Sequence, residues 1–347
     1  MADALRLGIA GAGVAGQMRA RAARAAGFEL VSVADPDVAA AARAARGASA
    51  VADYRAMIDR SDVDVVVVSV PTPLHEEVAV AALHAGKHVL CEKPLAATSR
   101  TCRRILDVAR QSGRTLAVGF NHRYLPPFRF LKHALEAGVI GRLTHVRALA
   151  GHDEVAGFRA PWMCLGALAG GGAMMDLGIH MTDLIRFLAG EIEDVAGAAT
   201  AGVWRLEGSE DDALALMRTT AGVVVAYHAT WTEWRGYTFR VEAYGDGGLI
   251  TAQYGPMANE IVLRRAGGGR HRKWKVYPRA NLRHRLLGWR DAARETFIAE
   301  LRDLARMIAG ERSSLAGGLD GLRAVELAEA VYESSRRRAV VRPGSQA

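Results

Sequence analysis

The 347-residue sequence has only three cysteines and no long apolar segment. Cys91, Cys102 and Cys164 show no paired spacing, which argues against a disulfide framework or a metal site and indicates reduced thiols in the cytosol. No apolar run approaches the roughly 20 residues of a bilayer-spanning helix, and the first residues lack the features of a signal peptide. The sequence therefore predicts a cytoplasmic protein with no metal and no membrane partner.

The composition is that of a globular protein, with 50% hydrophobic and 24% charged residues. The length predicts two domains. The formal net charge of +8 is concentrated late in the chain, mainly in residues 264–294. Because no nucleic-acid-binding motif accompanies these charges, we expect no nucleic acid partner. A solvated basic face, attraction of an acidic substrate and subunit contacts remain open.

The order of apolar and helical patterns predicts the fold class. Over the first 120 residues, short apolar runs alternate with helical segments. The runs lie at 5–10, 28–35, 63–70, 87–92 and 115–120. This pattern is typical of a doubly wound parallel sheet, the Rossmann arrangement. Beyond it, strand-like runs follow one another closely, which predicts an α+β domain with an open, mostly antiparallel sheet. We place the two domains at residues 1–122 and 123–347.

A dinucleotide fingerprint opens the first domain. GAGVAG supplies Gly11, Gly13 and Gly16 between a predicted strand and a predicted helix, and Asp35 ends the next strand. Gly11 permits a tight turn, Gly13 lets the backbone approach the pyrophosphate, and Gly16 lets helix and strand pack closely. The helix start, at Val14 and Ala15, offers free N–H groups to phosphate. The alternative is a glycine-rich turn that binds nothing.

Further cofactor residues are expected at the carboxyl ends of later strands. Asp35 can accept hydrogen bonds from both ribose hydroxyls and would repel a 2′-phosphate, which favours NAD over NADP. In SVPTPLHEE (69–77), Pro71 stiffens a loop from which Thr72 and His75 could reach the cofactor. For His75, a plain position at a helix start is an equal alternative.

The segment CEKP (91–94) also follows a strand. A lysine there, near bound NAD, could exchange a proton with substrate. A surface Lys93 that merely pairs with Glu92 is the competing interpretation.

A third group of residues lies in GGGAMMDLGIHMTDLIRFL. Asp176, His180 and Asp183 are spaced to share one face of a predicted helix that spans about 173–189. A histidine oriented by an aspartate is a natural general base for a hydroxyl group. The alternative is an ion pair on a helix surface, without catalysis.

Taken together, these motifs resemble those of the Gfo/Idh/MocA oxidoreductase family. The resemblance extends over nearly the whole chain and includes ADPD (34–37) and GFNHRY (119–124). It implies that Lys93, Asp176 and His180 act at the reacting carbon. It also implies that Glu92, Lys93 and Asn121 contact the cofactor, and that His122 and Arg123 contact substrate. His122 stands where the family more usually has arginine.

The implied reaction moves a hydride between a ring hydroxyl carbon of a sugar, cyclitol or derivative and the nicotinamide of NAD. His180 removes the hydroxyl proton, Asp176 orients it, and Lys93 stabilises the charge on the oxygen. Trp162 and Arg159 are candidate substrate contacts, although Trp162 could equally be a packing residue. The resemblance further implies a homodimer or homotetramer formed through the open sheet.

Two other functions remain compatible with the sequence. One is a redox-assisted glycosidase or lyase that keeps NAD tightly bound. The other is a regulator of the same fold that binds NAD without catalysis, but retention of Lys93, Asp176 and His180 argues against it.

Overall fold

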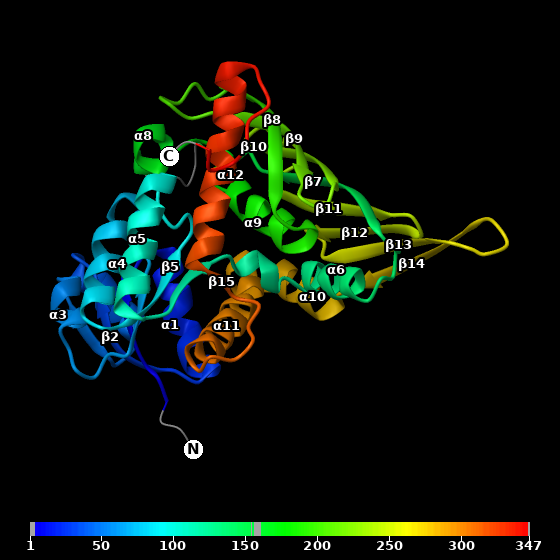
Figure 1. Cartoon of the computed structure of the whole chain (residues 1–347). Helices are drawn as coiled ribbons and strands as arrows, with labels where there is room; N and C mark the ends of the chain where they lie inside the picture. Colours follow the sequence, from blue (N-terminus) through cyan, green and yellow to red (C-terminus); the bar gives the residue numbers. More distant parts are fainter. Residues whose placement is uncertain (1–3, 154, 156–160, 346–347) are drawn as a thin grey trace. The chain divides into compact units, whose positions relative to one another are not determined.

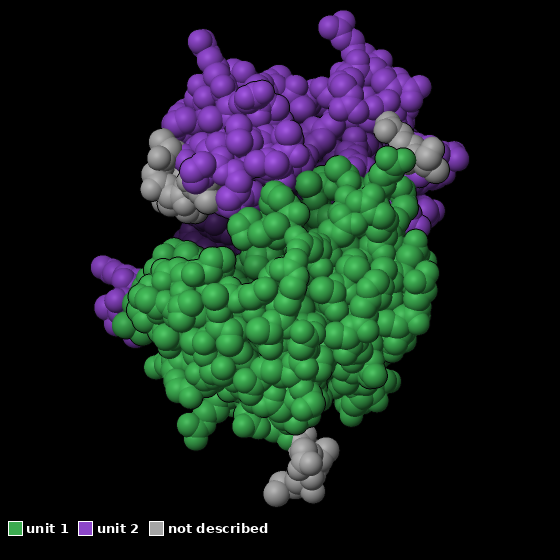
Figure 2. Space-filling view, turned by 90° about the vertical axis from the view of Figure 1, so that its left-hand side faces the viewer, with its two compact units in different colours: residues 1–121, 287–322 green, residues 122–286, 323–347 purple. Residues whose placement is uncertain are grey.

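The computed structural model describes residues 4–153, 155 and 161–345 and divides into two compact units. Unit 1 contains residues 1–121 and 287–322, and unit 2 contains residues 122–286 and 323–347 (Figures 1 and 2). The first boundary lies within one residue of the expected one. The second unit is not contiguous, however, because the chain returns to unit 1 near its end.

Unit 1 is built on a seven-stranded sheet in the order β15-β6-β5-β4-β1-β2-β3. Its strands are β1 (Arg6–Ala10), β2 (Glu29–Ala34), β3 (Ser49–Val51), β4 (Val65–Val68), β5 (His88–Glu92), β6 (Leu116–Gly119) and β15 (Ala316–Gly317). All pairs are parallel except that of β15 with β6. Apart from β15, this is the strand order of a Rossmann fold. All four valines of β4 are fully buried, as expected for a strand covered on both faces.

The helices of unit 1 connect and flank these strands. They are α1 (Val14–Ala26), α2 (Val38–Ala45), α3 (Tyr54–Ile58), the 3₁₀ turn η1 (Thr72–Leu74), α4 (His75–His84), α5 (Ser99–Ser112) and α11 (Trp289–Ile308). Helix α11 packs along α1, where Arg302 donates a hydrogen bond to the carbonyl of Ala25 at 2.8 Å. This packing, together with the pairing of β15 with β6, explains why residues 287–322 belong to unit 1 rather than to the second domain.

Unit 2 contains an eight-stranded sheet in the order β14-β13-β12-β11-β7-β10-β9-β8. The strands are β7 (Leu143–Gly151), β8 (Ile192–Thr200), β9 (Asp212–Thr219), β10 (Val224–Thr230), β11 (Thr238–Gly245), β12 (Gly248–Tyr254), β13 (Ala258–Arg264) and β14 (Arg270–Val276). Only β7 and β10 pair in parallel within the described sheet. The predicted open, mostly antiparallel sheet is confirmed, although the sequence did not indicate β12 or β14.

The remaining elements follow the second half of the chain. They are η2 (Asn121–Tyr124), α6 (Pro126–Glu136), η3 (Pro161–Cys164), α8 (Gly166–Ala169), α9 (Gly178–Ala189), α10 (Pro278–Leu287) and α12 (Gly318–Arg337). Helix α9 packs on β7 and β10, and α6 packs on β12 and β13. Among the helices of the described residues, none is both long and apolar enough to cross a membrane.

Candidate functional site

Each of the three glycines in the fingerprint is explained by a different steric requirement at its position. Gly11 has φ +97°, and a Cβ there would lie 2.5 Å from the Ser69 carbonyl oxygen. A Cβ on Gly16 would lie 1.9 Å from the Gly11 carbonyl oxygen, so strand and helix could not approach as they do. Apart from its chain neighbours, a Cβ on Gly13 would meet no atom of the described residues within 4 Å, so the space beside Gly13 is open to a ligand. These contacts fit a pyrophosphate cradle.

Asp35 is hydrogen-bonded to this loop. Its Oδ2 accepts a hydrogen bond from the Ala12 N–H at 2.7 Å, and its Oδ1 accepts one from the Asp37 N–H at 2.9 Å. Helix α1 begins directly after Gly13, which has no side chain to cap its N–H groups. The loop, the helix start and a carboxylate at the end of β2 therefore lie together, and these residues would hold NAD. Direct contacts from Val14, Ala15 and Asp35 remain predictions.

His75 connects the loop at the start of segment 69–77 to the CEKP segment. Its Nδ1 lies 2.9 Å from the Pro94 carbonyl oxygen and its Nε2 lies 2.9 Å from that of Val70. The side chain is 1% exposed. Burial lowers the pKa of His75, although the two carbonyl oxygens act in the opposite direction. This geometry favours a structural role in which His75 links the two loops through hydrogen bonds. Cofactor contacts from Pro71, Thr72 and His75 stay predictions.

The CEKP segment covers the last two residues of β5 and the two residues that follow it. The carboxylate of Glu92 forms an ion pair with Arg19 of α1, with 2.8 Å between Oε1 and NH2. Glu92 therefore has a partner in Arg19, and the roles expected for Lys93 stay predictions. Asn121, at the end of unit 1, donates to the Thr296 hydroxyl oxygen at 3.1 Å, and its predicted cofactor contact is untested.

Asp176 lies in the turn before α9 rather than within the helix, which begins at Gly178. Its Oδ2 accepts hydrogen bonds from His152 Nε2 and from Trp231 Nε1, each at 3.1 Å. His152 directly follows β7 and is 3% exposed. Two long-range donors thus hold this carboxylate, while its role in orienting His180 remains a prediction.

His180 lies in the first turn of α9 and faces His122. The two ring centroids are 4.0 Å apart. His122 Nε2 lies 3.0 Å from the Tyr237 hydroxyl oxygen, and its ring contacts Phe239 at 4.5 Å between centroids. Unit 2 therefore brings the predicted base next to the histidine that replaces the family's more usual arginine.

Asp183 and Arg123 form a separate buried ion pair. Arg123 Nε donates to Asp183 Oδ2 at 2.7 Å, and its NH2 donates to Oδ1 at 2.5 Å. The expectation that Asp183 shares one helix face with Asp176 and His180 is wrong, because Asp176 precedes the helix. Trp162 lies half-buried in η3, with its substrate contact untested, and Arg159 lies outside the described residues.

Glu210 supports the glycine-rich loop before Asp176. Its carboxylate accepts hydrogen bonds at 2.7 Å from the N–H groups of Gly172 and Met174, and one at 3.0 Å from the Tyr332 hydroxyl. Burial raises the pKa of Glu210, although these N–H groups oppose the shift. The sequence did not indicate Glu210, since its partners lie 36 to 122 positions away.

Other residues of the site also escaped the sequence interpretation. His152 had a local signal, since it follows a strand and precedes an acidic pair. Trp231 and Tyr237 had none, because their partners are distant in the chain.

Comparisons with known proteins place the chain in a family. The profile of the Gfo/Idh/MocA oxidoreductase family, described as an NAD-binding Rossmann fold, matches residues 5–120. The profile of the C-terminal domain of the same family matches residues 128–251. The inositol 2-dehydrogenase of Acidothermus cellulolyticus is 31% identical over 344 residues, which cover 96% of this chain and 93% of that enzyme.

Two further similarities involve levoglucosan dehydrogenases. The enzyme of Pseudarthrobacter phenanthrenivorans is 34% identical over 199 residues, or 56% of this chain and 51% of that enzyme, so this match spans about half of that relative. A solved levoglucosan dehydrogenase in complex with NADH has a TM-score of 0.87 at 25% identity, covering 98% of this chain and 99% of that one.

The chain belongs to the Gfo/Idh/MocA family and is an NAD-binding oxidoreductase. The predicted family, fold class, cofactor and enzyme class are thereby confirmed.

Proposed function

We propose that this oxidoreductase moves a hydride between a ring CH–OH carbon of a sugar, cyclitol or derivative and NAD. The observation that carries the proposal is the group of polar side chains at the start of α9. There Asp176 is held by His152 and Trp231, and His180 lies against His122. Polar side chains kept together in a largely buried place serve binding or chemistry more often than stability.

The chemistry assigned to these residues follows from their functional groups. His180 takes the proton of the substrate hydroxyl, because imidazole exchanges protons near neutral pH. Lys93 donates a hydrogen bond to the same oxygen and stabilises its developing negative charge. NAD, which the Gly11 loop and Asp35 would hold, would supply the acceptor for the hydride. The His122 imidazole and the Tyr237 hydroxyl, 3.0 Å apart, offer a polar pair to a neighbouring hydroxyl of the substrate.

The substrate class is supported by the relatives, which include inositol 2-dehydrogenases and a 1,5-anhydro-D-fructose reductase. The decisive experiment incubates the purified chain with NAD and a panel that includes myo-inositol and levoglucosan. The reverse reaction uses 1,5-anhydro-D-fructose with NADH. We expect at least one pair to change NADH absorbance, and no turnover across a broad polyol and sugar panel would contradict the proposal.

Variants test the roles of the residues. Loss of a general base typically costs about a hundred- to ten-thousandfold in rate, so His180→Ala and Lys93→Ala are expected to lose most of kcat while retaining NAD affinity. His84→Ala, which changes an exposed histidine at the end of α4, is the control and is expected to keep full turnover. Near-normal turnover of His180→Ala would refute the assignment.

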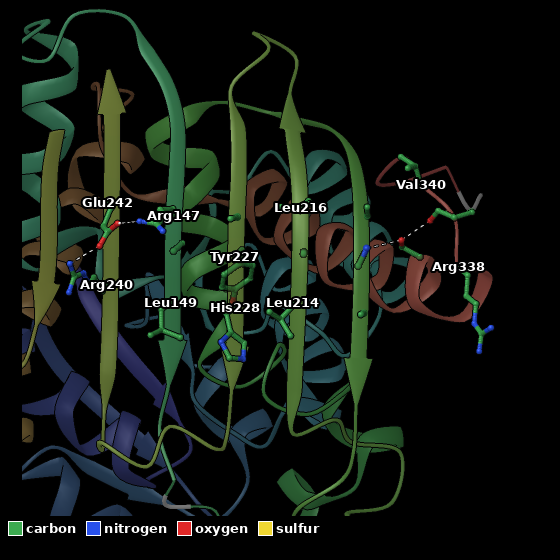
Figure 3. A pocket seen from close by; sticks show the side chains of 18 residues that line it. Arg147, Leu149, Leu214, Leu216, Tyr227, His228, Arg240, Glu242, Arg338 and Val340 are labelled. Atoms are coloured by element: carbon green, nitrogen blue, oxygen red, sulfur yellow. Dashed lines mark hydrogen bonds and ion pairs between the residues drawn. The ribbon is translucent and has the colours of Figure 1, made fainter. Parts of the chain in front are cut away.

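We further propose that the enzyme is cytosolic and homo-oligomeric. Cys91, Cys102 and Cys164 form no disulfide within the described part of the chain, which suits a reducing compartment. A second copy is the proposed occupant of the open face of the unit 2 sheet, part of which Figure 3 shows. One row across this face runs through Ala196, Leu216, Ala226, Arg147, Glu242, Thr251, Glu260 and Trp274.

Exposure and charge both support a second copy on this face. Leu214 and Leu216 are 53% and 59% exposed, which is unusual for neighbouring leucines on a sheet. Beside them, Arg147 and Arg240 pair with Glu242. A face that carries an apolar patch and charges of both signs can meet its own copy across a twofold axis without net repulsion.

A further inference from the structure

Arg19 is a fully buried cation in unit 1 that the reaction described above does not use. It lies on α1 and is 0% exposed. Its Nε donates to Glu92 Oε1 at 2.8 Å, and its NH1 donates to Glu300 Oε2 on α11. The guanidinium carbon lies 4.5 Å from the centroid of the Phe297 ring. Buried charges are expensive unless paired, so the two carboxylates stabilise the buried guanidinium.

The neighbouring strand makes room for the ion pair. Gly119 ends β6, next to the end of β5. A Cβ on Gly119 would lie 2.7 Å from Arg19 NH2 and 2.9 Å from Glu92 Oε2. Since Gly119 has an ordinary backbone conformation, with no positive φ, the glycine is explained by this space rather than by its φ angle.

The ion pair lies directly beside Lys93. Glu92 is the last residue of β5 and precedes Lys93 in the chain. On the other side of Lys93, the Pro94 carbonyl oxygen is held by His75. Buried groups therefore fix the backbone on both flanks of the lysine.

Electrostatics favours a cationic Arg19 as the partner of Glu92. Burial by itself would lower the pKa of Arg19, but the charges of Glu300 and Glu92 more than offset it, and the pKa is raised. The Glu92 charge also acts on the pKa of the buried His75 imidazole of α4 and of the buried Cys91 thiol. Arg19 offsets the Glu92 charge from the adjacent helix.

We propose that Arg19 is a positioning residue for Lys93. By engaging the Glu92 carboxylate from inside the fold, it fixes the end of β5, and with it the backbone from which Lys93 reaches the substrate oxygen. Arg19 does not touch ligand itself, because its side chain is completely buried. The inference rests on the proposed role of Lys93 and adds a residue that acts through Glu92.

The test combines Arg19→Lys with Lys93→Met in a double-mutant cycle. The substrate is whichever of myo-inositol and levoglucosan turns over faster with NAD. Misplacement of a reacting group by about 1 Å can cost a hundredfold, so Arg19→Lys is expected to lower kcat by about ten- to a hundredfold. KM is expected to change less than kcat, and the NAD dissociation constant from calorimetry to stay within about threefold, or 0.7 kcal/mol. In the Lys93→Met background, Arg19→Lys is expected to have no further effect on kcat.

Two additional variants separate positioning from stability. Glu300→Gln removes the other carboxylate partner of Arg19, so it is expected to lower Tm while kcat stays near normal. If Arg19→Lys does not fold, the double variant Arg19→Gln/Glu300→Gln keeps the net charge of the cluster and is expected to show the same loss of kcat.

The outcomes distinguish this inference from the proposed function. A near-normal kcat for Arg19→Lys, or an equal proportional loss in the presence and absence of Lys93, overturns the positioning role. An equal loss of kcat in Glu300→Gln also overturns it, because the effect would then follow stability alone. Near-normal turnover of Lys93→Met contradicts the proposed function itself.

Discussion

At the scale of single residues, Asp35 is the predicted determinant of cofactor choice. Its carboxylate lies at the end of β2, hydrogen-bonded to the glycine loop, where a 2′-phosphate would meet a negative charge. We expect NAD to bind at least about tenfold more tightly than NADP, or 1.4 kcal/mol. Calorimetry with both cofactors measures this difference, and Asp35→Ser is expected to reduce it.

Asp37 provides the matched control. It lies two residues further on and caps α2, where its Oδ1 accepts from the Ala40 N–H at 3.0 Å. Because serine also caps helices, Asp37→Ser is expected to keep both the fold and the preference for NAD. Equal affinities of the unaltered protein for the two cofactors would contradict the prediction.

His75 is expected to make stability depend on pH. Its pKa in the folded chain lies below the ordinary value of 6.5, so the unfolded chain binds the proton more readily. Stability from this group is therefore complete above about pH 6.5 and decreases as the pH falls, by at most about 1.4 kcal/mol per pH unit. His88 contributes in the same direction, since burial lowers its pKa as well.

Urea unfolding between pH 5 and pH 8 measures this effect. His75→Gln is expected to be less stable at pH 8, through loss of a buried hydrogen bond worth about 1 kcal/mol, but to show a shallower decrease toward acid. His133, whose side chain is 71% exposed, supplies the control His133→Gln. If the slopes of His75→Gln and the unaltered protein coincide, His75 does not cause the acid sensitivity.

At the scale of elements, substitutions in the glycine loop and at the start of α1 are expected to distinguish NAD binding from folding. Among the described residues other than its chain neighbours, a Cβ on Gly13 would meet no atom within 4 Å, whereas one on Gly16 would collide with the Gly11 carbonyl oxygen. We expect Gly13→Ala to keep its Tm but to lose most of its NAD affinity, because the methyl group occupies the space for pyrophosphate. Gly16→Ala is expected to show both a lower Tm and a weaker affinity for NAD.

Differential scanning fluorimetry and calorimetry report the two quantities for each variant. Alanine is also the better helix former, so helix propensity cannot explain a loss in Gly16→Ala. Normal NAD affinity in Gly13→Ala would show that the cofactor phosphates bind elsewhere.

Elements were predicted well where the pattern was local and less well where packing decides. The strands of unit 1 follow uninterrupted apolar runs such as the four valines of β4, and all six parallel strands except the short β3 were expected. Helix α9 begins at Gly178 rather than near residue 173, after a turn in which Glu210 accepts hydrogen bonds from the N–H groups of Gly172 and Met174. That partner lies more than 30 residues away, outside any local pattern.

At the scale of the whole molecule, the open face of the unit 2 sheet is expected to hold a second copy. Leu216→Asp places a charge in the middle of the exposed apolar patch and should split the oligomer, because a buried unpaired carboxylate is costly. Sedimentation velocity or light scattering at micromolar concentration measures the assembly. The folded subunit is expected to persist, since this side chain is 59% exposed.

Val38→Asp is the control for this experiment. Val38 is 46% exposed at the first position of α2, where a negative charge favours the helix. It should leave the assembly unchanged. A monomeric unaltered protein, or an unchanged oligomer in Leu216→Asp, would contradict the proposed interface.

The sequence by itself determined the family, the doubly wound parallel sheet of unit 1 and the position of the glycine loop. Each of these depends on short-range features: three glycines within six residues, an acid at the next strand end, and alternation of strands with helices. Steric demands of a tight turn act over a few residues, so they can be recognised locally.

Only the tertiary structure decided which distant residues pair with the candidate site residues. Arg19 meets Glu300 across 281 positions, and Asp176 meets Trp231 across 55. The return of residues 287–322 to unit 1 likewise depends on the packing of α11 along α1. Buried polar groups must find partners wherever the fold brings them, and the identity of such a partner depends on three-dimensional packing that no short stretch of sequence contains.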